Sequence, residues 1–285
     1  MMMRSLLILL ALCCPAFAQD AASLRRDVTV LAADEMGGRV PSSAGMMKAQ
    51  TYVVEQLQAA GFHPVSQRVK TRYGICYNVI LTIPGVILDQ GIVVGAHLDH
   101  VRPDRQGRVI NGADDNASGC AALIGLAKRL KDARPRKCIT FVWFTAEETG
   151  NFDGATTYVT SLRRKPYAMI NLDMIGYLGR TNEKATNYKT RLDQVLDPLY
   201  AKFPFAQAIT YEECPSVRGS CKPDSDQYAF CSRGIPSVLI HTGLHNNYHK
   251  HTDDPDTLNY DGMEKVCEYV YHLIISLVGS ERKLY

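Results

Sequence analysis

Hydrophobic residues recur along this chain with two different spacings. Between residues 45 and 60 they return every three or four positions, which predicts an amphipathic helix that ends before Gly61. The members of this stripe are Met46, Ala49, Val53, Leu57 and Ala60. Residues 92–96 and 138–145 are instead short apolar runs, as found in strands that are buried on both faces. One chain therefore carries the patterns of both helices and buried strands.

The same two patterns alternate over the rest of the sequence. Further helices are predicted at residues 23–33, 117–131, 152–162, 189–203 and 263–278, with a loop at residues 34–39. Further strands are predicted at residues 65–73, 76–83, 167–172, 207–211 and 236–241. This alternation predicts an α/β fold of three layers, α/β/α, with a central, mixed but mostly parallel, twisted sheet. No linker or internal repeat is visible, so we expect residues 19–285 to form a single domain.

The N-terminal residues have the three parts of a secretory signal peptide. Arg4 supplies positive charge, residues 6–14 are apolar, and Ala16-Phe17-Ala18 is a cleavage site of the small-x-small type. We therefore expect residues 1–18 to be removed and the mature protein to be exported, either to the periplasm or out of the cell. No later stretch is long and apolar enough for a transmembrane helix.

Charge and cysteine content narrow the range of partners and crosslinks. The net charge is only +3 and like charges do not form long runs, so nucleic acid is not an expected partner. Of the nine cysteines, seven follow the predicted signal peptide, and an odd number leaves at least one of them free. Disulfides can form in an exported protein, and we predict one between Cys214 and Cys221, which bracket a short loop.

Histidine and acidic residues follow several of the predicted strands, and in open α/β sheets ligands bind at the carboxyl ends of the strands. His97 follows the apolar run at residues 92–96 and can offer an imidazole nitrogen to a metal ion. Asp99 can accept the other ring N–H and so fix the imidazole. His100 is expected to support this motif rather than to bind metal. Taken alone, His97 could also be a strand-end histidine bonded to the main chain.

Two further acidic motifs suit metal chemistry. In GADDNASG, residues 112–119, Asp115 follows Asp114 in a turn of small residues, and its two oxygens can bridge two cations. A helix cap is the ordinary alternative. In TAEETG, residues 145–150, the side chains of Glu147 and Glu148 diverge at the end of a hydrophobic strand. One can therefore bind a metal while the other faces a metal-bound water as general base.

The last candidates come later in the chain. Asp173 lies in an apolar strand, where a carboxylate is costly unless it is paired or metal-bound. His249 and His251 lie two positions apart in NYHKHTDDPD, and either could be a ligand. Together the motifs supply two histidines and three carboxylates, a set of nitrogen and oxygen donors that suits two zinc ions. A serine hydrolase is disfavoured, because the chain lacks a GxSxG sequence.

The motifs AHLDH, GADDNASG, FTAEETG and NLDMIG, in this order and spacing, resemble those of the M28 family of metallopeptidases, the co-catalytic zinc aminopeptidases. The resemblance runs from LAADEMGGR at residues 31–39 to HTDDPD at residues 251–256. It implies the zinc-exopeptidase type of fold and a set of five zinc ligands. These ligands are His97, Asp115, Glu148, Asp173 and His249.

The resemblance also implies how the ligands are shared between two ions. Asp115 would bridge the ions, and the peptide bond that follows it would be cis. His97 and Asp173 would bind opposite ions, one of them together with Glu148. His249 would complete the second ion.

The resemblance also implies roles for two further residues, and the chain departs from the family pattern at two positions. Glu147 matches the general base of the family, and Asp99 matches the carboxylate that orients a ligand. Gln227 stands where family members often have a histidine that can contact substrate. His251 stands where the family has a proline, and we favour His249 over it as the ligand.

We therefore expect an exported aminopeptidase, monomeric, with two zinc ions per chain. It would hydrolyse the N-terminal peptide bond of peptides with a free N-terminus, through a hydroxide that bridges the metals, with Glu147 as base. One alternative is a glutaminyl cyclase of the same fold, which uses one zinc ion and places tryptophans around its pocket. The only tryptophan here, Trp143, lies inside a predicted strand. The other alternative is an inactive binding protein on a peptidase scaffold. We expect residues 177–187 and 214–228 to form the pocket walls.

Overall fold

The computed structural model describes residues 20–181, 192–213 and 223–280. Within them, seven strands form one sheet in the order β1-β2-β4-β3-β5-β7-β6. The strands are β1 Val65–Thr71, β2 Gly74–Ile83, β3 Ile87–His97, β4 Lys137–Phe144, β5 Ala168–Leu172, β6 Thr210–Glu213 and β7 Ser237–His241. The central strands β4, β3, β5 and β7 are parallel, whereas β1, β2 and β6 pair antiparallel with their neighbours. The sheet is mixed around a parallel centre, as predicted.

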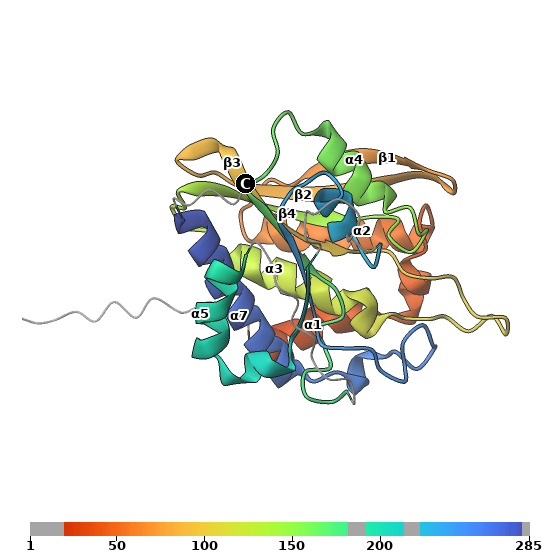
Figure 1. Cartoon of the computed structure of the whole chain (residues 1–285). Coiled ribbons are helices and arrows are strands. Elements are labelled where there is room, and N and C mark those ends of the chain that lie inside the picture. The colour runs from red at the N-terminus through yellow and green to blue at the C-terminus, as the bar shows by residue number, and fades with distance from the viewer. Residues whose placement is uncertain (1–19, 182–191, 214–222, 281–285) are drawn as a thin grey trace, which may run out of the picture.

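Helices cover both faces of this sheet (Figure 1). The described α-helices are α1 Ala21–Leu31, α2 Ala44–Ala59, α3 Gly119–Arg129, α4 Asp153–Ser161, α5 Asp193–Lys202, α6 Gln227–Cys231 and α7 Tyr260–Gly279. The helices α1, α2, α3, α5 and α7 contribute to the core on one face, and α4 and α6 contribute to the core on the other. The predicted three-layer α/β/α architecture is therefore confirmed.

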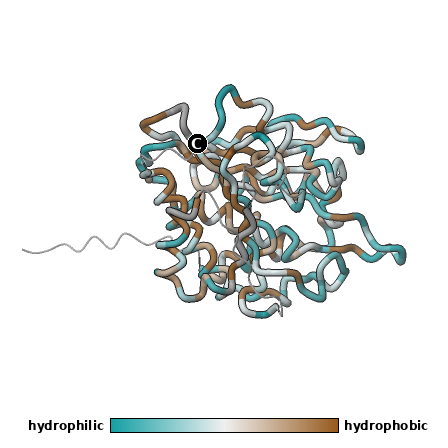
Figure 2. The backbone as a smooth tube through the Cα atoms, in the orientation of Figure 1, coloured by the Kyte–Doolittle hydropathy of each residue, from teal (hydrophilic) through white to brown (hydrophobic). Residues whose placement is uncertain are grey.

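Apolar side chains on both faces of the central strands explain the continuous apolar runs in the sequence. On β3, Val94 and Ala96 belong to the larger core with α3 and α7, whereas Val93 belongs to the smaller core with α4 and α6. On β4, Phe141 and Val142 divide between the two cores in the same way. Successive strand side chains point to opposite faces, so a strand between two helix layers has no polar side. Figure 2 shows the hydrophobic segments gathered inside and hydrophilic ones in the outer loops.

The structure adds short helical segments that the hydrophobic pattern does not predict. A 3-10 helix, Asp34–Arg39, replaces the predicted loop, and α6 forms where no element was predicted. Another 3-10 helix, Pro204–Ala208, takes part of the strand predicted at residues 207–211, so that β6 begins only at Thr210. The remaining short segments are a π-helical turn, Ala113–Ser118, and a 3-10 turn, Pro255–Thr257. Segments this short cannot display a helical period, which is why hydrophobic spacing misses them.

Some predictions concern residues outside the described ranges. They are the signal peptide at residues 1–18, the disulfide between Cys214 and Cys221, and the first residues of the helix predicted at residues 189–203. Within the described ranges, no helix has both the length and the apolar character that a membrane crossing requires.

A fully buried arginine joins the first helix to the loops that follow β3. The guanidinium group of Arg39 donates hydrogen bonds to main-chain carbonyl oxygens at 2.6–3.4 Å. The acceptors belong to Leu31, Leu98, Asn111, Gly112 and Asp115. Buried carbonyl groups without a donor are costly, so one side chain satisfies groups from three distant segments. Arg39 thereby fixes the position of the loop between β3 and α3 against α1.

Replacing Arg39 by Met should lower the free energy of unfolding by about 3 kcal/mol or more, because several buried carbonyl oxygens lose their donor. Urea denaturation followed by circular dichroism measures this change. The matched control is Arg68→Met, since Arg68 is exposed on β1, and it should change the unfolding free energy by no more than about 0.5 kcal/mol. Equal effects of the two substitutions would contradict the role given to Arg39.

Candidate functional site

The predicted site residues meet at one edge of the sheet, where the parallel strands end. His97 is the last residue of β3, and Asp173 directly follows β5. Glu147 and Glu148 lie in the loop after β4, and His249 lies in the loop after β7. Parallel strands bring their carboxyl ends to the same edge, so residues that are far apart in the sequence become neighbours.

Among the described residues, three groups of side chains could hold a metal ion, and His97, Asp115 and Asp173 form the one that we call the first group. Nε2 of His97 lies 3.2 Å from Oδ1 of Asp115 and 3.2 Å from Oδ1 of Asp173. The hydroxyl group of Ser225 donates a hydrogen bond of 2.7 Å to the other oxygen of Asp173. This bond holds the Asp173 carboxylate with one oxygen turned toward His97.

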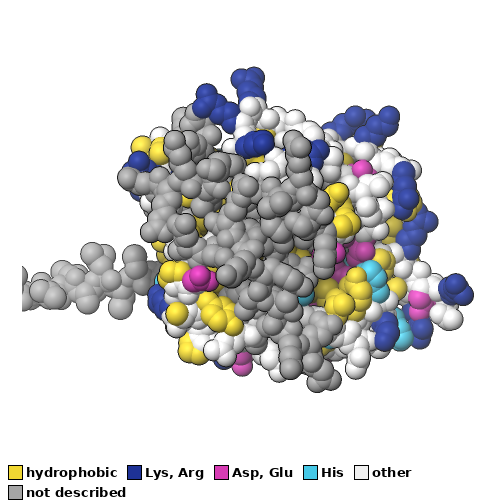
Figure 3. Space-filling view, viewed as in Figure 1, with side chains coloured by type: hydrophobic (Ala, Val, Ile, Leu, Met, Phe, Trp, Pro, Cys, Tyr) yellow, Lys and Arg dark blue, Asp and Glu magenta, His cyan; other side chains and the backbone are white. Residues whose placement is uncertain are grey.

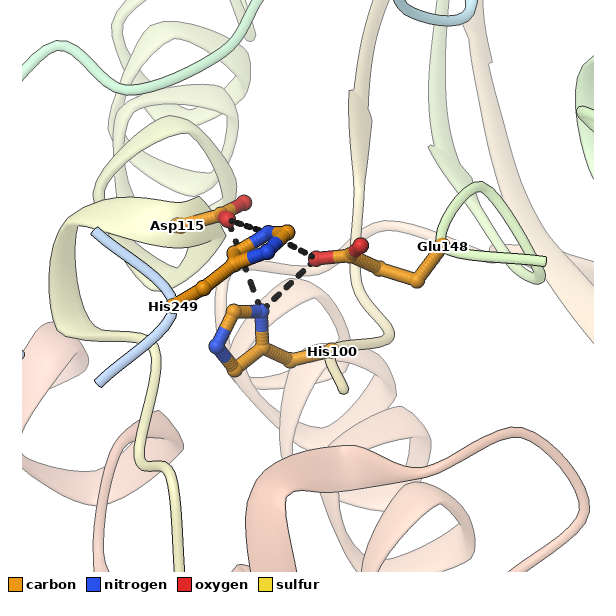
Figure 4. A group of neighbouring side chains, drawn as sticks. All are labelled: His100, Asp115, Glu148 and His249. Atoms are coloured by element: carbon orange, nitrogen blue, oxygen red, sulfur yellow. Dashed lines mark hydrogen bonds and ion pairs between the residues drawn. The ribbon is translucent and has the colours of Figure 1, made fainter. Parts of the chain in front are cut away.

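Asp115 also belongs to a second group, with His100, Glu148 and His249 (Figure 4). Oδ2 of Asp115 lies 3.1 Å from Nε2 of His249 and 3.6 Å from Nδ1 of His100. Oε1 of Glu148 lies 2.9 Å from the same His100 nitrogen and 3.4 Å from the His249 nitrogen. His100, which was expected only to support the motif, therefore faces the same point as the other three donors.

The division of residues between the two groups differs in part from the expectation. Asp115 directs Oδ1 to the first group and Oδ2 to the second, as a bridging carboxylate would. His97 and Asp173 were expected on opposite ions, but they lie together in the first group. The reason is the strand order, because β5 pairs directly with β3 and the residues at the ends of these two strands are adjacent.

The two histidines that the sequence left open are separated by the structure. His249 lies in the second group. His251 points elsewhere, with its Nε2 atom 3.1 Å from Nη1 of Arg108, and it belongs to neither group. The geometry therefore favours His249 as the ligand.

The donor atoms of both groups have the chemistry and spacing of zinc ligands. Imidazole nitrogen and carboxylate oxygen bind zinc at about 2.0–2.2 Å, which places the donors around a tetrahedral ion about 3.3 Å from one another. The separations between histidine nitrogens and carboxylate oxygens are 3.2 Å in the first group and run from 2.9 to 3.6 Å in the second, and all donor atoms of a group lie within 4.8 Å of one another. The residues present therefore fit zinc.

The main chain around Asp115 is held from several sides. The carboxylate of Asp253 accepts hydrogen bonds from the N–H groups of Asp114 and Asp115 at 3.0–3.1 Å. Gly112 has a φ of 59°, and a Cβ atom there would lie 2.1 Å from the carbonyl oxygen of Asp115. This close approach explains why GADDNASG begins with glycine. The peptide bond after Asp115 is cis, as the family resemblance implies.

Asp99 supports the site in a different way from the one expected. Nδ1 of His97 bonds to the main-chain oxygen of Asp99 at 3.0 Å, and not to its carboxylate. The carboxylate instead accepts the main-chain N–H groups of Glu147 and Glu148 at 3.1 and 3.2 Å. Asp99 therefore orients His97 with its main chain and positions both glutamates with its side chain.

Burial and the crowding of carboxylates shift the pKa values of the site. Burial raises the pKa of Glu147 well above its ordinary value, and the charges of Asp173 and Glu148 add to the rise. Burial opposes the charged form of His249, but its bonds to Asp115 and Glu148 outweigh burial and raise its pKa to about 10. The site thus favours extra positive charge.

One acidic residue beside the site, Asp226, is not among the residues that the sequence predicts. Asp226 is fully buried, and neither of its carboxylate oxygens has a hydrogen-bond partner among the described residues. Burial raises its pKa well above the ordinary value, and the charges of Asp99 and Asp173 raise it further. The sequence points to this segment only through Gln227. No sequence pattern indicates that Asp226 is buried near the candidate metal ligands.

A cavity of about 460 Å³ opens beside the two groups. Beyond the candidate site residues, its wall consists of Met174, Pro223, Asp224, Leu239, His241, Leu244 and Tyr248. The ring of Tyr248 stacks on that of His249, with centroids 3.9 Å apart. Figure 3 shows acidic, histidine and hydrophobic side chains gathered at one place on this face. Of the predicted wall segments, only Pro223 and Asp224 line the cavity, and residues 182–187 and 214–222 lie outside the described ranges.

The fold is similar to those of solved exopeptidases and cyclases. A zinc-dependent exopeptidase from Parabacteroides distasonis has a TM-score of 0.69 and 19% identity, over 90% of this chain and 98% of that chain. A glutaminyl cyclase from Tannerella forsythia has a TM-score of 0.70 and 19% identity, over 90% of this chain and 99% of that chain. This likeness confirms the predicted zinc-exopeptidase type of fold.

The relatives that are similar in sequence include a bacterial enzyme and a fungal one. Leupeptin-inactivating enzyme 1 of Streptomyces exfoliatus is 33% identical over 155 residues, which are 52% of this chain and 34% of the relative. A probable leucine aminopeptidase of Trichophyton verrucosum is 30% identical over 267 residues, which are 87% of this chain and 69% of the relative. The chain thus spans about a third of the first relative and about two thirds of the second.

The model of Peptidase family M28 matches residues 78–274, a range that includes every candidate metal ligand. This match confirms the family that the motifs resemble and, with it, the expected class of metallopeptidase hydrolases. The chain belongs to peptidase family M28.

Proposed function

We propose that this chain is an exported aminopeptidase with two zinc ions, which hydrolyses the N-terminal bond of peptides with a free N-terminus. The observation that carries the proposal is Asp115, whose two oxygens face two separate groups of zinc-type donors. The family and the aminopeptidase name of one relative favour the same reaction. Export rests on the signal-like pattern of residues 1–18 alone.

The first group would hold one ion through His97, Asp115 and Asp173, and the second group would hold another through Asp115, Glu148 and His249. Bound zinc lowers the pKa of water toward neutrality and polarises a carbonyl group. The hydrogen bond between Nδ1 of His97 and the Asp99 carbonyl oxygen leaves Nε2 directed at the first group, as a zinc ligand requires.

Glu147 would act as the general base and then as the general acid. It lines the cavity, and one of its carboxylate oxygens lies within 4.8 Å of donor atoms of His97 and Glu148. A carboxylate whose pKa is raised by burial accepts a proton more readily near neutral pH than a solvated one. Asp99 holds the loop of Glu147 through the main-chain N–H group. Glu147 can therefore take a proton from the attacking water and hand it to the leaving amine.

The cavity wall suits the charged end of a peptide. Glu147, Glu148, Asp173 and Asp224 place carboxylates on it, and these attract the α-ammonium group of a free N-terminus. Met174, Leu239 and Leu244 add apolar surface beside them for a substrate side chain. A peptide whose N-terminus is acetylated has no charge to offer at this place.

Glu147→Gln should lower kcat on aminoacyl p-nitroanilides by about 10²- to 10⁴-fold without changing the zinc content, because the amide keeps the shape but cannot accept a proton. Steady-state kinetics gives kcat, and elemental analysis counts zinc per chain. The exposed Glu55 on α2 provides the matched control, Glu55→Gln, which should behave as wild type. Near-normal turnover of the zinc-loaded Glu147→Gln variant would mean that another group is the base.

The same measurements separate the alternatives. One zinc ion per chain, with ammonia released from glutaminyl peptides, would favour a glutaminyl cyclase. Trp143, the only tryptophan, argues against a cyclase pocket, since it is fully buried and its ring N–H bonds to the carbonyl oxygen of Cys120. Two bound zinc ions without turnover of any aminoacyl substrate would favour a binding protein.

Without zinc, the protein should lose stability as the pH rises from about 6.5 to about 10. His249 has a pKa of about 10 in the folded protein against an ordinary value of 6.5, so the folded state binds this proton more tightly than the unfolded state. The stabilisation is therefore complete below pH 6.5 and is lost as the pH rises through 10. Thermal unfolding of chelator-treated protein at several pH values measures it.

Two variants and zinc itself serve as controls for this pH dependence. His249→Gln should lose less stability over the same range, whereas His63→Gln, on an exposed residue, should match wild type. Added zinc should reduce the loss, because it supplies the positive charge in place of protons. Equal stability of the zinc-free wild type at pH 7 and pH 10 would contradict the charge balance inferred for the site.

A further inference from the structure

We propose that His100 is a fourth protein ligand of the zinc ion held by Asp115, Glu148 and His249. The protein would then supply four donors to this ion and three to the other. The inference rests on the proposed function for the presence of zinc, and it goes beyond the five ligands that the family resemblance implies.

The ring of His100 directs Nδ1 at the donor atoms of the second group (Figure 4). This nitrogen lies 2.9 Å from Oε1 of Glu148 and 3.6 Å from Oδ2 of Asp115. The His100 and His249 rings meet edge to face, with centroids 5.6 Å apart. One donor atom from each of the four residues lies within 4.8 Å of all the others. Nδ1 of His100 therefore faces the same point as Nε2 of His249.

A hydrogen bond to Glu148 does not by itself account for the burial of this ring. His100 is completely buried, and its Nε2 atom has no hydrogen-bond partner among the described residues. In either neutral tautomer one ring nitrogen stays unsatisfied, and this penalty offsets what a single hydrogen bond at Nδ1 contributes. Zinc binding at Nδ1 would leave the Nε2–H group unsatisfied as well, but a bond to zinc contributes far more than a hydrogen bond and outweighs this penalty. A ligand role therefore explains better why the ring is buried here.

The surrounding main chain prevents His100 from turning away. A Cβ atom at Gly112 would lie 2.5 Å from Cδ2 of the His100 ring, so glycine is needed for the loop to pass so close. The ring is thus enclosed between the main chain at Gly112 on one side and Glu148 and His249 on the other. Packing against these protein groups therefore fixes the direction of the ring.

A fourth ligand makes the two groups unequal. Structural zinc sites have four protein ligands, whereas catalytic sites have three and an open position. With His100 the second group has four donors, and the first has three, His97, Asp115 and Asp173. The second group would therefore hold its ion more tightly than the first group, beside which Glu147 approaches His97.

Stepwise zinc binding to the full chain, stripped with a chelator, tests this inference. Competition with a chromogenic chelator gives two dissociation constants. His100→Asn keeps an N–H donor near the place of Nδ1, so it can preserve the bond to Glu148 but not a zinc ligand. We expect the tighter step to weaken at least about 100-fold and the other step to change less than about threefold. His272→Asn is the control, because His272 also bonds to a glutamate, Glu268, at 3.0 Å but lies on α7.

Unchanged constants for both steps in a folded His100→Asn variant would overturn the inference, because His100 would then only bond to Glu148. X-ray absorption of the wild type with one equivalent of zinc gives a readout that does not depend on the folding of a variant. Two imidazole ligands on the bound zinc are expected. A single imidazole would also overturn the inference.

Failure of this inference and failure of the proposed function can be told apart. If His100→Asn loses the tighter step but the wild type cleaves no aminoacyl substrate, the ligand stands and the aminopeptidase proposal fails. If the wild type is an active aminopeptidase and His100→Asn binds both ions normally, the aminopeptidase stands and the ligand proposal fails.

Discussion

The candidate site depends on one electrostatic constraint, which is that acidic side chains crowded into a buried place need positive charge beside them. Burial opposes the charge of His97, but Asp173 and Glu147 outweigh burial and raise its pKa well above the ordinary value. Burial likewise acts to raise the pKa of Asp115, yet His100, His249 and His97 together hold it well below its usual range. Each group is thus stabilised by the charge of the others. Such a cluster favours cations, and a divalent ion supplies more charge at one point than a proton on each ring.

The loop that carries Asp115 is held in place by two side chains of opposite charge. Neither side chain is one of the candidate metal ligands. Arg39 donates to carbonyl oxygens of this loop, and Asp253 accepts from its N–H groups. Both side chains are fully buried. Because they bind the main chain, they fix the loop without competing for the oxygens of Asp115. The main chain that carries the Asp115 carboxylate is therefore held by protein groups other than the candidate donors, which is what a tight and specific metal site requires.

The sequence predicts the fold class and the convergence of the site residues, since both follow from apolar runs and from the motifs at strand ends. It does not predict how the donors divide into two groups, because that depends on β5 pairing with β3, and hydrophobic spacing carries no strand order. The sequence predicts that the Asp99 carboxylate orients His97, but the main-chain oxygen of Asp99 does so, and the carboxylate binds the Glu147 main chain instead. Sequence alone does not distinguish these oxygens. The sequence also does not predict that the His100 ring faces the donors or that the Asp226 carboxylate is buried, because the direction of a ring and the burial of a carboxylate are tertiary properties.

The choice between a two-ion peptidase and a one-ion cyclase cannot be made from the fold, because solved examples of both resemble this chain equally well. The choice depends on the first group, formed by His97, Asp115 and Asp173. A protein that uses one ion needs only one set of donors, and placing Asp173 next to the buried Asp115 without an ion there would crowd two carboxylates at a cost. Yet this chain holds both of them in place, Asp173 through the hydroxyl group of Ser225 and His97 through the main chain of Asp99. Supporting contacts of this kind around both sets of donors favour two ions, and so favour the peptidase.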